Sequence, residues 1–253
     1  MGRKLSSARV AIVTGSAHGI GLSFSRALLD QKIKVAMLDN DAEALESAMA
    51  RISAPGSQAL PLVTDITGEA DVDAAIEAVL RRFERIDILV NNAGLIFDLR
   101  SPIEEITLAD WHRSMDVNVT GTFLMCRASM PHMKKESRGR IVNMSSALAG
   151  TGAPGRVHYT TAKAAIIGLT RSLAREGGPY GITVNALAPG LIDSGPRARQ
   201  FVPDDIFAFE ERRRCIPKRM HPEDLISALL FLTSEISNFI TGQVLVVDGG
   251  ASM

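Results

Sequence analysis

Cysteine pairs, net charge and clustered histidines are all missing from this sequence, and each absence excludes a class of protein. The two cysteines, Cys126 and Cys215, lie far apart and form no CxxC pair, which excludes a disulfide framework and a zinc site built on such pairs. Lys plus Arg and Asp plus Glu number 28 each, so we expect no nucleic-acid partner. No HxxH or HxxxH pair is present and no metal is expected, because five histidines are scattered: His18, His112, His132, His158 and His221.

Long apolar runs are also missing. The longest, such as residues 225–232, fall far short of the ~20 residues that span a bilayer, so no membrane partner is expected. The apolar residues 10–13 after the polar N-terminus are fewer than the ~7–15 of a secretory signal. Because 46% of the residues are hydrophobic, the chain can still build a globular core. We therefore expect a soluble, cytoplasmic protein.

Short β-branched runs alternate with segments of helical periodicity. The expected strands are nearly continuous in apolar residues, which is typical of strands buried on both faces: 10–13, 35–38, 60–63, 86–90, 140–143, 182–186 and 244–247. The expected helices are 20–31, 42–52, 71–83, 111–133, 159–176 and 223–232. The alternation predicts an α/β, Rossmann-type, doubly wound fold with seven mostly parallel strands and helices on both faces. No linker divides the chain, so residues 1–253 are predicted to form a single domain.

Residues 191–220 break the alternation. They contain no clean strand, and glycine and proline punctuate them at Gly195, Pro196, Pro203 and Pro217. An irregular stretch of this length in a compact domain is usually a functional lid or a disordered loop.

A glycine-rich turn follows the first expected strand. Its sequence is Thr14-Gly15-Ser16-Ala17-His18-Gly19-Ile20-Gly21, with the spacing GxxxGxG, and it leads directly into an expected helix. Glycines permit a tight turn and let the backbone approach a pyrophosphate, which the free N–H groups of a helix N-terminus attract. Such a turn can serve packing alone, but its place between strand and helix favours dinucleotide binding.

Asp39 ends the second expected strand, eighteen residues after Gly21. A carboxylate there can accept hydrogen bonds from the adenosine ribose hydroxyls. It would repel the 2′-phosphate of NADP by roughly 4 kcal/mol at a separation of ~4 Å and an effective dielectric constant of ~20. No Lys or Arg stands beside it to bind that phosphate, so we expect NAD as the cofactor. The alternative is that Asp39 only caps the next helix.

Polar residues also end the third and fourth expected strands, at Asp65-Ile66 and at Asn91-Asn92-Ala93-Gly94. Ligands of open α/β sheets bind outside the carboxyl ends of the strands, so both segments are predicted to face one crevice. Asp65 could hold the adenine amine, or it could cap a helix instead.

Tyr159 and Lys163 are four residues apart at the start of an expected helix, which places both on one face. A cation near a phenol favours the phenolate and lowers its pKa, and a phenol tuned in this way exchanges protons with an alcohol or ketone. Ser146 follows the fifth expected strand, where its hydroxyl could bond a substrate oxygen. Alone, a Tyr-x-x-x-Lys pair is usually a chance occurrence.

Together, these motifs resemble those of the classical short-chain dehydrogenase/reductase family. The resemblance runs from Thr14 to Gly250 and rests on motifs in the family's order: Thr14-Gly15-x-x-x-Gly19-Ile20-Gly21, Asn91-Asn92-Ala93-Gly94, Asn118, Ser146, Tyr159-x-x-x-Lys163, Pro189-Gly190 and residues 241–250. Each motif is weak by itself, but their order and spacing are specific.

The resemblance implies a role for each matching residue. Tyr159 would be the catalytic acid/base, Lys163 would hold the nicotinamide ribose and lower the pKa of Tyr159, and Ser146 would polarise the substrate oxygen. Asn118 would hold a water that links Lys163 to solvent, while Ser145 is expected to be structural. The implied NAD-binding residues are Gly15, Ser16, His18, Gly19, Ile20, Gly21, Asp39, Asn40, Asp65, Ile66, Asn92, Ala93, Gly94, Tyr159, Lys163, Pro189, Gly190, Ile192 and Ser194.

The sequence departs from the family pattern at Ser194, four residues beyond Gly190, where the family usually has Thr. The hydroxyl that meets the nicotinamide carboxamide is kept and the methyl group is lost, so cofactor binding is expected to survive. Ile192 would offer its backbone to the same carboxamide.

The substrate side is defined less sharply. Residues 191–220 occupy the place of the family's substrate lid, and four further apolar residues are expected near the substrate: Leu95, Ile96, Leu148 and Val157. Aromatic residues of the lid could line an apolar pocket: Phe201, Phe207 and Phe209. Arginines of the lid could meet an anion, although a solvated helix explains the run 212–214 better: Arg197, Arg199, Arg212, Arg213 and Arg214. Arg156, three residues before Tyr159, could pair with an anionic substrate or be a surface charge.

Three functions fit these motifs. The first is an NAD-dependent oxidoreductase that transfers a hydride between the nicotinamide and a secondary alcohol or ketone. The second is a 3-oxoacyl-thioester reductase of fatty-acid-synthesis type, whose usual preference for NADPH conflicts with Asp39. The third is a non-catalytic NAD-binding regulator, which loss of a catalytic residue would favour. The resemblance also implies a homotetramer, with helices 111–133 and 159–176 in one interface and the last strand with its helix in another.

Overall fold

A computed structural model of the chain describes residues 8–52, 58–95 and 101–253. Its centre is a seven-stranded sheet in the order β3-β2-β1-β4-β5-β6-β7, and every neighbouring pair is parallel. The strands are β1 (Val10–Thr14), β2 (Lys34–Asp39), β3 (Ala59–Val63), β4 (Ile88–Asn91), β5 (Gly139–Met144), β6 (Ile182–Pro189) and β7 (Val244–Val247). The predicted doubly wound α/β fold is confirmed, with a sheet that is wholly parallel.

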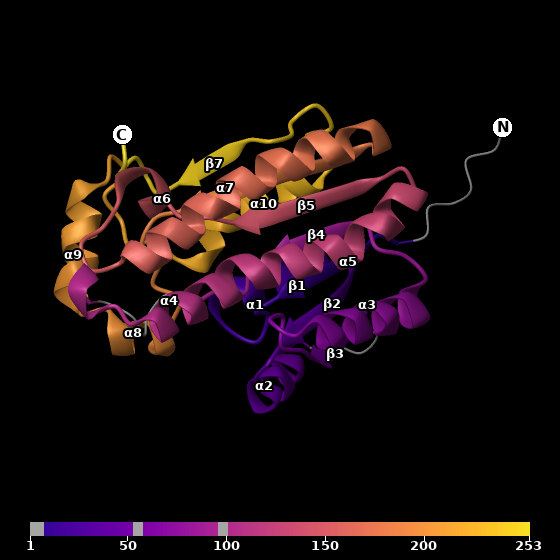
Figure 1. Cartoon of the computed structure of the whole chain (residues 1–253), viewed down its shortest axis with the longest axis horizontal. Coiled ribbons are helices and arrows are strands. Elements are labelled where there is room, and N and C mark those ends of the chain that lie inside the picture. Colours follow the sequence, from indigo (N-terminus) through magenta and orange to yellow (C-terminus); the bar gives the residue numbers. More distant parts are fainter. Residues whose placement is uncertain (1–7, 53–57, 96–100) are drawn as a thin grey trace.

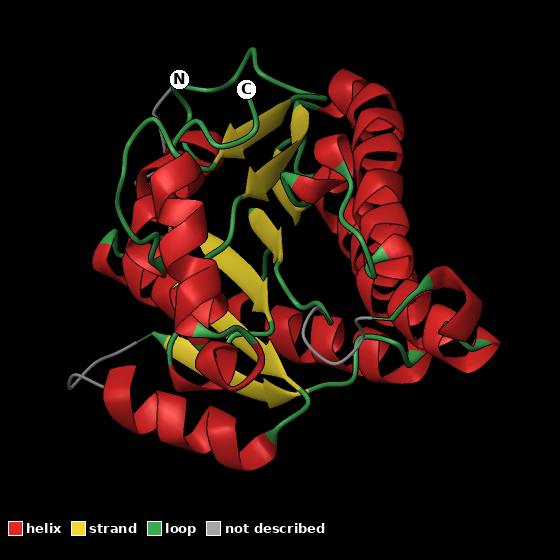
Figure 2. Ribbon diagram, turned by 90° about the vertical axis from the view of Figure 1, so that its left-hand side faces the viewer, coloured by secondary structure: helices red, strands yellow, loops and turns green. Residues whose placement is uncertain are grey.

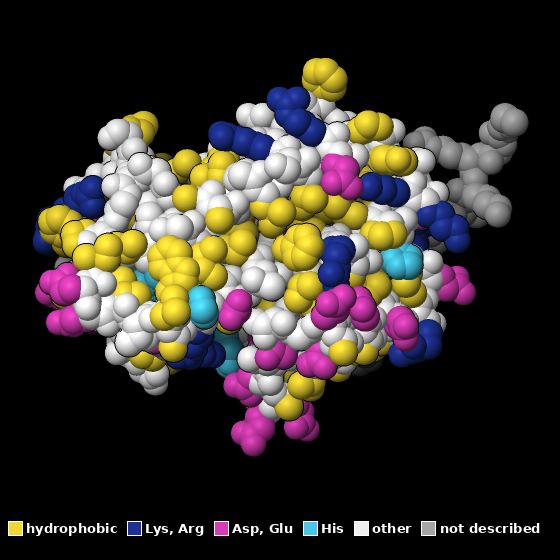
Figure 3. Space-filling model, viewed as in Figure 1, with side chains coloured by type: hydrophobic (Ala, Val, Ile, Leu, Met, Phe, Trp, Pro, Cys, Tyr) yellow, Lys and Arg dark blue, Asp and Glu magenta, His cyan; other side chains and the backbone are white. Residues whose placement is uncertain are grey.

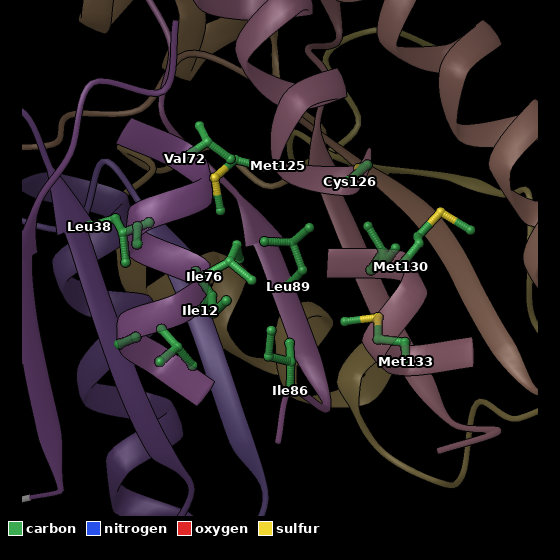
Figure 4. Close-up of a cluster of buried hydrophobic side chains, with 14 of the residues drawn as sticks. Ile12, Leu38, Val72, Ile76, Ile86, Leu89, Met125, Cys126, Met130 and Met133 are labelled. Atoms are coloured by element: carbon green, nitrogen blue, oxygen red, sulfur yellow. The ribbon is translucent and has the colours of Figure 1, made fainter. Parts of the chain in front are cut away.

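Helices cover both faces of the sheet (Figure 2). One core packs the sheet against α3 (Glu69–Phe83), α5 (Gly121–Lys135) and α7 (Val157–Gly177). Figure 4 shows part of this core, where Ile12 and Leu89 of the strands face Ile76 and Met125 of the helices. The second core packs the other face against α1 (Gly19–Asp30), α2 (Ala42–Ile52) and α10 (Ile226–Thr233).

The edge strands are an exception to the burial that the apolar runs predict. The inner strands β1, β4 and β5 are buried at every position. In β7, by contrast, Leu245 and Val246 are 36% and 46% exposed, and in β3 Val63 is 63% exposed. An apolar run can therefore mark a strand without marking which of its faces are covered within one chain.

Two helical predictions need correction. The helix expected over residues 111–133 is α4 (Leu108–Met115), a π-helical turn η2 (Asp116–Thr120) and α5 in succession. The stretch 191–220, expected to be irregular, contains α8 (Pro196–Phe201) and α9 (Asp204–Arg213). Proline stands at the first position of α8 and directly before α9, where its fixed φ suits the start of a helix.

The carboxyl ends of the strands point to the end of the molecule where the short helix α6 (Leu148–Thr151), α8 and α9 lie (Figure 1). The strand order reverses between β1 and β4, and crevices at such reversals hold the ligands of open parallel sheets. Three 3₁₀ turns complete the described elements: η1 (Ile103–Glu105), η3 (Gly178–Tyr180) and η4 (Pro222–Leu225). Among the described helices, none is long and apolar enough to cross a bilayer.

Candidate active site

The glycine turn joins β1 to α1 and has space only for glycine at its critical positions. Gly15 and Gly19 have φ of +62° and +45°, in the left-handed region. A Cβ on Gly21 would lie 2.0 Å from the carbonyl oxygen of Gly15. Ser16 is fully buried, and its backbone N–H and Oγ both donate to Leu38 O at 3.1 Å. The turn therefore presents bare backbone and the N-terminus of α1, which fits a pyrophosphate.

The end of β4 is bonded to this turn. Thr14 Oγ1 accepts hydrogen bonds from the backbone N–H groups of Asn92 and Ala93, each at 3.0 Å. Asn92 Nδ2 donates to Thr14 O and Gly15 O at the same distance. Asn92 thus fixes the end of β4 against the glycine turn, and Thr14 Oγ1 is the acceptor that holds the Asn92 backbone in place. Thr14 belongs to the motif but is not among the predicted binding residues.

Asp39 lies at the mouth of the turn. Its Oδ2 accepts a hydrogen bond from Ala17 N at 2.9 Å, and its Oδ1 accepts one from Asp41 N at 3.2 Å. Helix α2 is capped by Asp41, whose Oδ1 accepts from Ala44 N at 2.9 Å. The alternative that Asp39 merely caps the next helix is therefore wrong. The neighbouring Asn40 is exposed.

Asp65 follows β3 and is exposed. Its Oδ1 accepts from the backbone N and Oγ1 of Thr67 at 2.9 and 2.8 Å, which closes a local turn. Helix α3 has Gly68 at its N-cap and no side-chain cap, so Asp65 does not cap it either. Ile66 is buried, and a Cβ on Gly121 would lie 2.5 Å from its Cδ1, so Ile66 packs against the start of α5.

Four predicted catalytic side chains converge beyond the ends of β4 and β5. Ser146 follows β5, Tyr159 and Lys163 lie one turn apart in α7, and Asn118 lies in the π-helical turn; all are buried. A Cβ on Gly94 would lie 2.9 Å from Asn118 Oδ1 and 3.2 Å from Lys163 Nζ, which places these two side chains side by side.

Backbone hydrogen bonds hold this cluster. Asn118 Nδ2 donates to Leu95 O at 3.1 Å, and its Oδ1 accepts from Leu95 N at 3.3 Å. Lys163 Nζ donates to Met144 O at 3.0 Å and lies 5.8 Å from the ring centre of Tyr159. Ser145 Oγ donates to Lys163 O at 2.8 Å, which agrees with the structural part predicted for Ser145. π-Helical turns are frequent at functional sites, and here one turns Asn118 inward.

The expected lowering of the pKa of Tyr159 by Lys163 is wrong for this structure. Burial raises the pKa of Tyr159, while a hydrogen bond from Ser146 and the charge of Arg156 act in the opposite direction. Burial also lowers the pKa of Lys163 to about 8. The Lys163 ammonium is bonded to the Met144 carbonyl and is itself costly to keep charged, so it does not offset the burial of the phenol.

Lys163 is a predicted catalytic residue, but burial of its ammonium is expected to lower the stability of the folded protein. Between pH 8 and 10.5 the unfolded chain keeps a proton on Lys163 that the folded protein has released, so the free energy of unfolding rises with pH in this window. We expect Lys163→Met to lack this rise and to be more stable at pH 7 by about 1–3 kcal/mol. Urea unfolding from pH 7 to 10.5 measures both effects. Lys135→Met, at an exposed position of α5, is the control, and equal pH slopes in all three proteins would contradict the expectation.

The segment after β6 returns to the glycine turn. A Cβ on Gly19 would lie 2.9 Å from Ser194 Cβ, so Ser194 is close to the start of α1, where His18 is the N-cap and Ile20 the second helical residue. Pro189 ends β6, and a Cβ on Gly190 would lie 2.8 Å from Asp248 Cβ. Ile192 is buried in the second core. The structure thus brings Ser194 against the glycine turn, and the cofactor-binding part of these residues remains a prediction.

The predicted substrate residues are partly brought together. Leu148 and Arg156 are half-buried beside the catalytic cluster and Val157 is exposed, whereas Ile96 lies outside the described residues. Phe207 is 2% exposed and packs inside the lid rather than lining an open pocket, while Phe201 and Phe209 are exposed.

The arginine run of the lid is not a uniformly solvated face. Arg214 is buried, and it donates to Leu191 O at 2.6 Å and Lys218 O at 2.7 Å, which joins the two ends of the lid. Asp193 is buried and lies between two predicted residues, Ile192 and Ser194, but is not itself among the predicted site residues. No local pattern distinguishes it. Among the described residues, no three His, Cys, Asp or Glu side chains are grouped to hold a metal ion.

Comparisons with known proteins agree with this geometry. The family model described as enoyl-(acyl carrier protein) reductase matches residues 15–252. The chain is 41% identical to (2S)-[(R)-hydroxy(phenyl)methyl]succinyl-CoA dehydrogenase subunit BbsD of Thauera aromatica, over 97% of each chain. It is 36% identical to gluconate 5-dehydrogenase of Gluconobacter oxydans, over 98% of this chain and 96% of that one.

A solved structure shows the same architecture. The 3-ketoacyl-(acyl-carrier-protein) reductase from Brucella melitensis, complexed with NADH, superposes with a TM-score of 0.89 at 33% identity and covers 97% of this chain and 98% of that one. The glycine turn, the buried Ser-Tyr-Lys-Asn cluster and these full-length matches lead to one conclusion. The chain belongs to the classical short-chain dehydrogenase/reductase family and is an oxidoreductase.

Proposed function

We propose that the chain is an NAD-dependent dehydrogenase that interconverts a secondary alcohol and a ketone. The observation that carries this proposal is the pairing of the Ser146 and Tyr159 hydroxyls, buried in a cluster with Lys163 and Asn118 beside the end of β4, which is bonded to the glycine turn. A bound nicotinamide cofactor would accept or supply the hydride at the substrate carbon. The residues of the chain then have only a proton to move.

In the direction of reduction, Ser146 Oγ and Tyr159 Oη donate hydrogen bonds to the substrate carbonyl oxygen, and Tyr159 gives up its proton as the carbonyl becomes an alcohol. Burial holds the phenol protonated at neutral pH, so it is ready as the acid. In oxidation the same oxygen, as phenolate, takes the proton of the alcohol. Lys163 would hold the ribose of a bound cofactor, and Asn118 would hold a water that links Lys163 to solvent.

NAD is the cofactor we propose, because Asp39 brings a carboxylate to the mouth of the glycine turn. Asp39→Asn keeps an oxygen that can accept from Ala17 N and removes the charge. We expect it to reduce the preference for NAD over NADP, measured as the ratio of kcat/KM values, by tenfold or more, which is ~1.4 kcal/mol. Asp41→Asn, two residues away at the cap of α2, is the matched control and is expected to keep the preference. Equal use of both cofactors by the unaltered chain would refute the assignment.

A second candidate is a 3-oxoacyl-thioester reductase, which the similarity to the Brucella melitensis enzyme favours. One substrate panel separates the two functions when NADH and NADPH absorbance is followed. The panel contains gluconate, cyclic and acyclic secondary alcohols, simple ketones and a 3-oxoacyl thioester. Turnover of alcohols with NAD supports the proposal, and efficient reduction of the thioester alone, with NADPH, supports the second candidate. Binding of NAD without any turnover would instead indicate a regulator.

We also propose that the chain forms a homotetramer and that it is located in the cytoplasm. Hydrophobic side chains gather on the face that carries α5 and α7 (Figure 3), where Phe123 is 43% exposed. A second apolar surface lies on the edge strand β7 and the turn before it, with Leu245, Val246 and Phe239 exposed. Two separate apolar surfaces are what an assembly with two kinds of interface needs. Light scattering measures the mass of the assembly in solution, and a mass of four chains is the expected result.

A further inference from the structure

Arg219 lies outside the catalytic cluster, yet it faces three carboxylates. Its Nε donates to Glu211 Oε1 at 2.7 Å, and its Nη1 donates to Asp204 Oδ1 at 2.8 Å and lies 3.5 Å from Asp193 Oδ2. Its guanidinium also stacks on the ring of Phe207, 4.8 Å from the ring centre. Planar stacking together with several N–H donors is a combination that Arg provides and Lys does not.

Apart from Asp193, these contacts lie on one face of α9. Asp204, Phe207 and Glu211 are spaced three and four residues apart, which aligns them along one side of the helix. Phe207 is among the largest fully enclosed side chains of the chain. Arg219 therefore holds this face of α9 by an aromatic contact in the middle and an ion pair at each end.

Asp193 connects the two lid helices, because α8 bonds to it directly through Arg199 and α9 is linked to it through Arg219. Its side chain has no exposed surface. Arg199 of α8 donates to it through Nε and Nη2 at 2.9–3.0 Å, Gly195 N donates at 3.2 Å, and Arg219 approaches from the other side. Burial opposes ionisation, but the bonds from Arg199 and Gly195 outweigh it and hold the pKa of Asp193 below its ordinary value.

The carboxylate that receives these bonds is next to the glycine turn. Ser194 follows Asp193 directly and lies against Gly19, because a Cβ added to Gly19 would lie 2.9 Å from Ser194 Cβ. A cavity of about 250 Å³ opens at this place, lined by Gly19, Ser194, Arg199 and His221 among others. A continuous series of contacts thus runs from α9 through Arg219, Asp193 and Ser194 to the start of α1.

We propose that Arg219 is a positioning residue, which latches α9 onto Asp193 and so couples the position of the lid to the glycine turn. The inference rests on the proposed function in one respect, namely that α8 and α9 cover the substrate. Removal of the Arg219 charge leaves Asp193 paired with Arg199. We then expect the fold and the catalytic cluster to remain intact, while α9 loses the ion pairs that link it through Arg219 to Asp193.

The test compares Arg219→Met with Lys218→Met in the full-length protein. Methionine keeps an apolar chain over Phe207 and removes the ion pairs. Lys218 is the adjacent residue, and its exposed ammonium forms an ion pair with Asp224, so it is the matched control. Hydrogen exchange of residues 196–213 is followed with and without saturating NADH. In Arg219→Met we expect exchange in this segment to become at least about tenfold faster than in the unaltered protein and in Lys218→Met, while exchange in the sheet stays unchanged.

Kinetics of the panel substrate that is turned over fastest supply the second readout. We expect Arg219→Met to raise its KM about tenfold and to lower kcat less than about threefold, with Arg219→Lys in between. Unchanged exchange in 196–213, or faster exchange throughout the chain, overturns the latch. If no panel substrate reacts, the proposed function fails, but exchange with and without NADH still decides on the latch.

Discussion

Tyr159→Phe is expected to lower kcat by about a thousandfold, the middle of the range for removal of a positioned acid or base. The variant loses one oxygen and keeps the ring, which is buried beside Lys163. Because the hydroxyl is the group that exchanges a proton with the substrate, no other described side chain in the cluster can replace it at that position. The loss should appear in kcat for every substrate of the panel and with either cofactor.

The chain contains its own control for this experiment. Its only other tyrosine is Tyr180, which is 43% exposed in η3 with Lys134 stacked on its ring. Tyr180→Phe removes the same atom far from the crevice and should leave kcat unchanged. NADH titration by fluorescence should give similar Kd values for the unaltered protein and both variants, because the pyrophosphate site on the glycine turn is intact and the Tyr159 hydroxyl is only one of many predicted NAD contacts. A Tyr159→Phe enzyme with near-normal kcat would exclude the proposed mechanism.

Predictions from the sequence succeeded where a short segment carries all the information. The glycine turn is an example, because its positive φ angles and close approach to Gly15 need glycine at those places and at no others nearby. The pair Tyr159 and Lys163 is another, since one helical turn determines that they share a face. The inner strands were also predicted well, because burial on both faces leaves a continuous apolar run.

Predictions failed where distant segments decide the outcome. The pKa of Tyr159 depends on how deeply the phenol is enclosed and on where Lys163 turns its ammonium, and neither follows from a spacing of four. The same holds for Asp193, whose partners Arg199 and Arg219 come from both sides of α9. In the sequence Pro196 and Pro203 read as breaks, although proline is also favoured at the first position of a helix, and here the two prolines stand at the starts of α8 and α9.

Gly21→Ala is expected to have the second largest effect, through the shape of the turn. Gly21 has a helical backbone conformation that alanine adopts easily, so strain in φ is not the reason. The added Cβ would instead lie 2.0 Å from Gly15 O and 2.6 Å from Asn92 Nδ2. These atoms form the crevice wall, so the turn must shift by more than an ångström and the N–H groups that meet the pyrophosphate are displaced.

We expect this substitution to weaken NADH binding by about a hundredfold and to lower the free energy of unfolding by about 1–3 kcal/mol, as overpacked sites do. Gly178→Ala is the control, because Gly178 also has helical φ and ψ, no atom lies within 4 Å of its added Cβ, and it follows the end of α7 away from the crevice. Fluorescence titration gives the Kd and urea unfolding the stability. If Gly21→Ala bound NADH as tightly as Gly178→Ala, the pyrophosphate could not lie on this turn, and the proposed place of the cofactor would have to be abandoned even though the family assignment would stand.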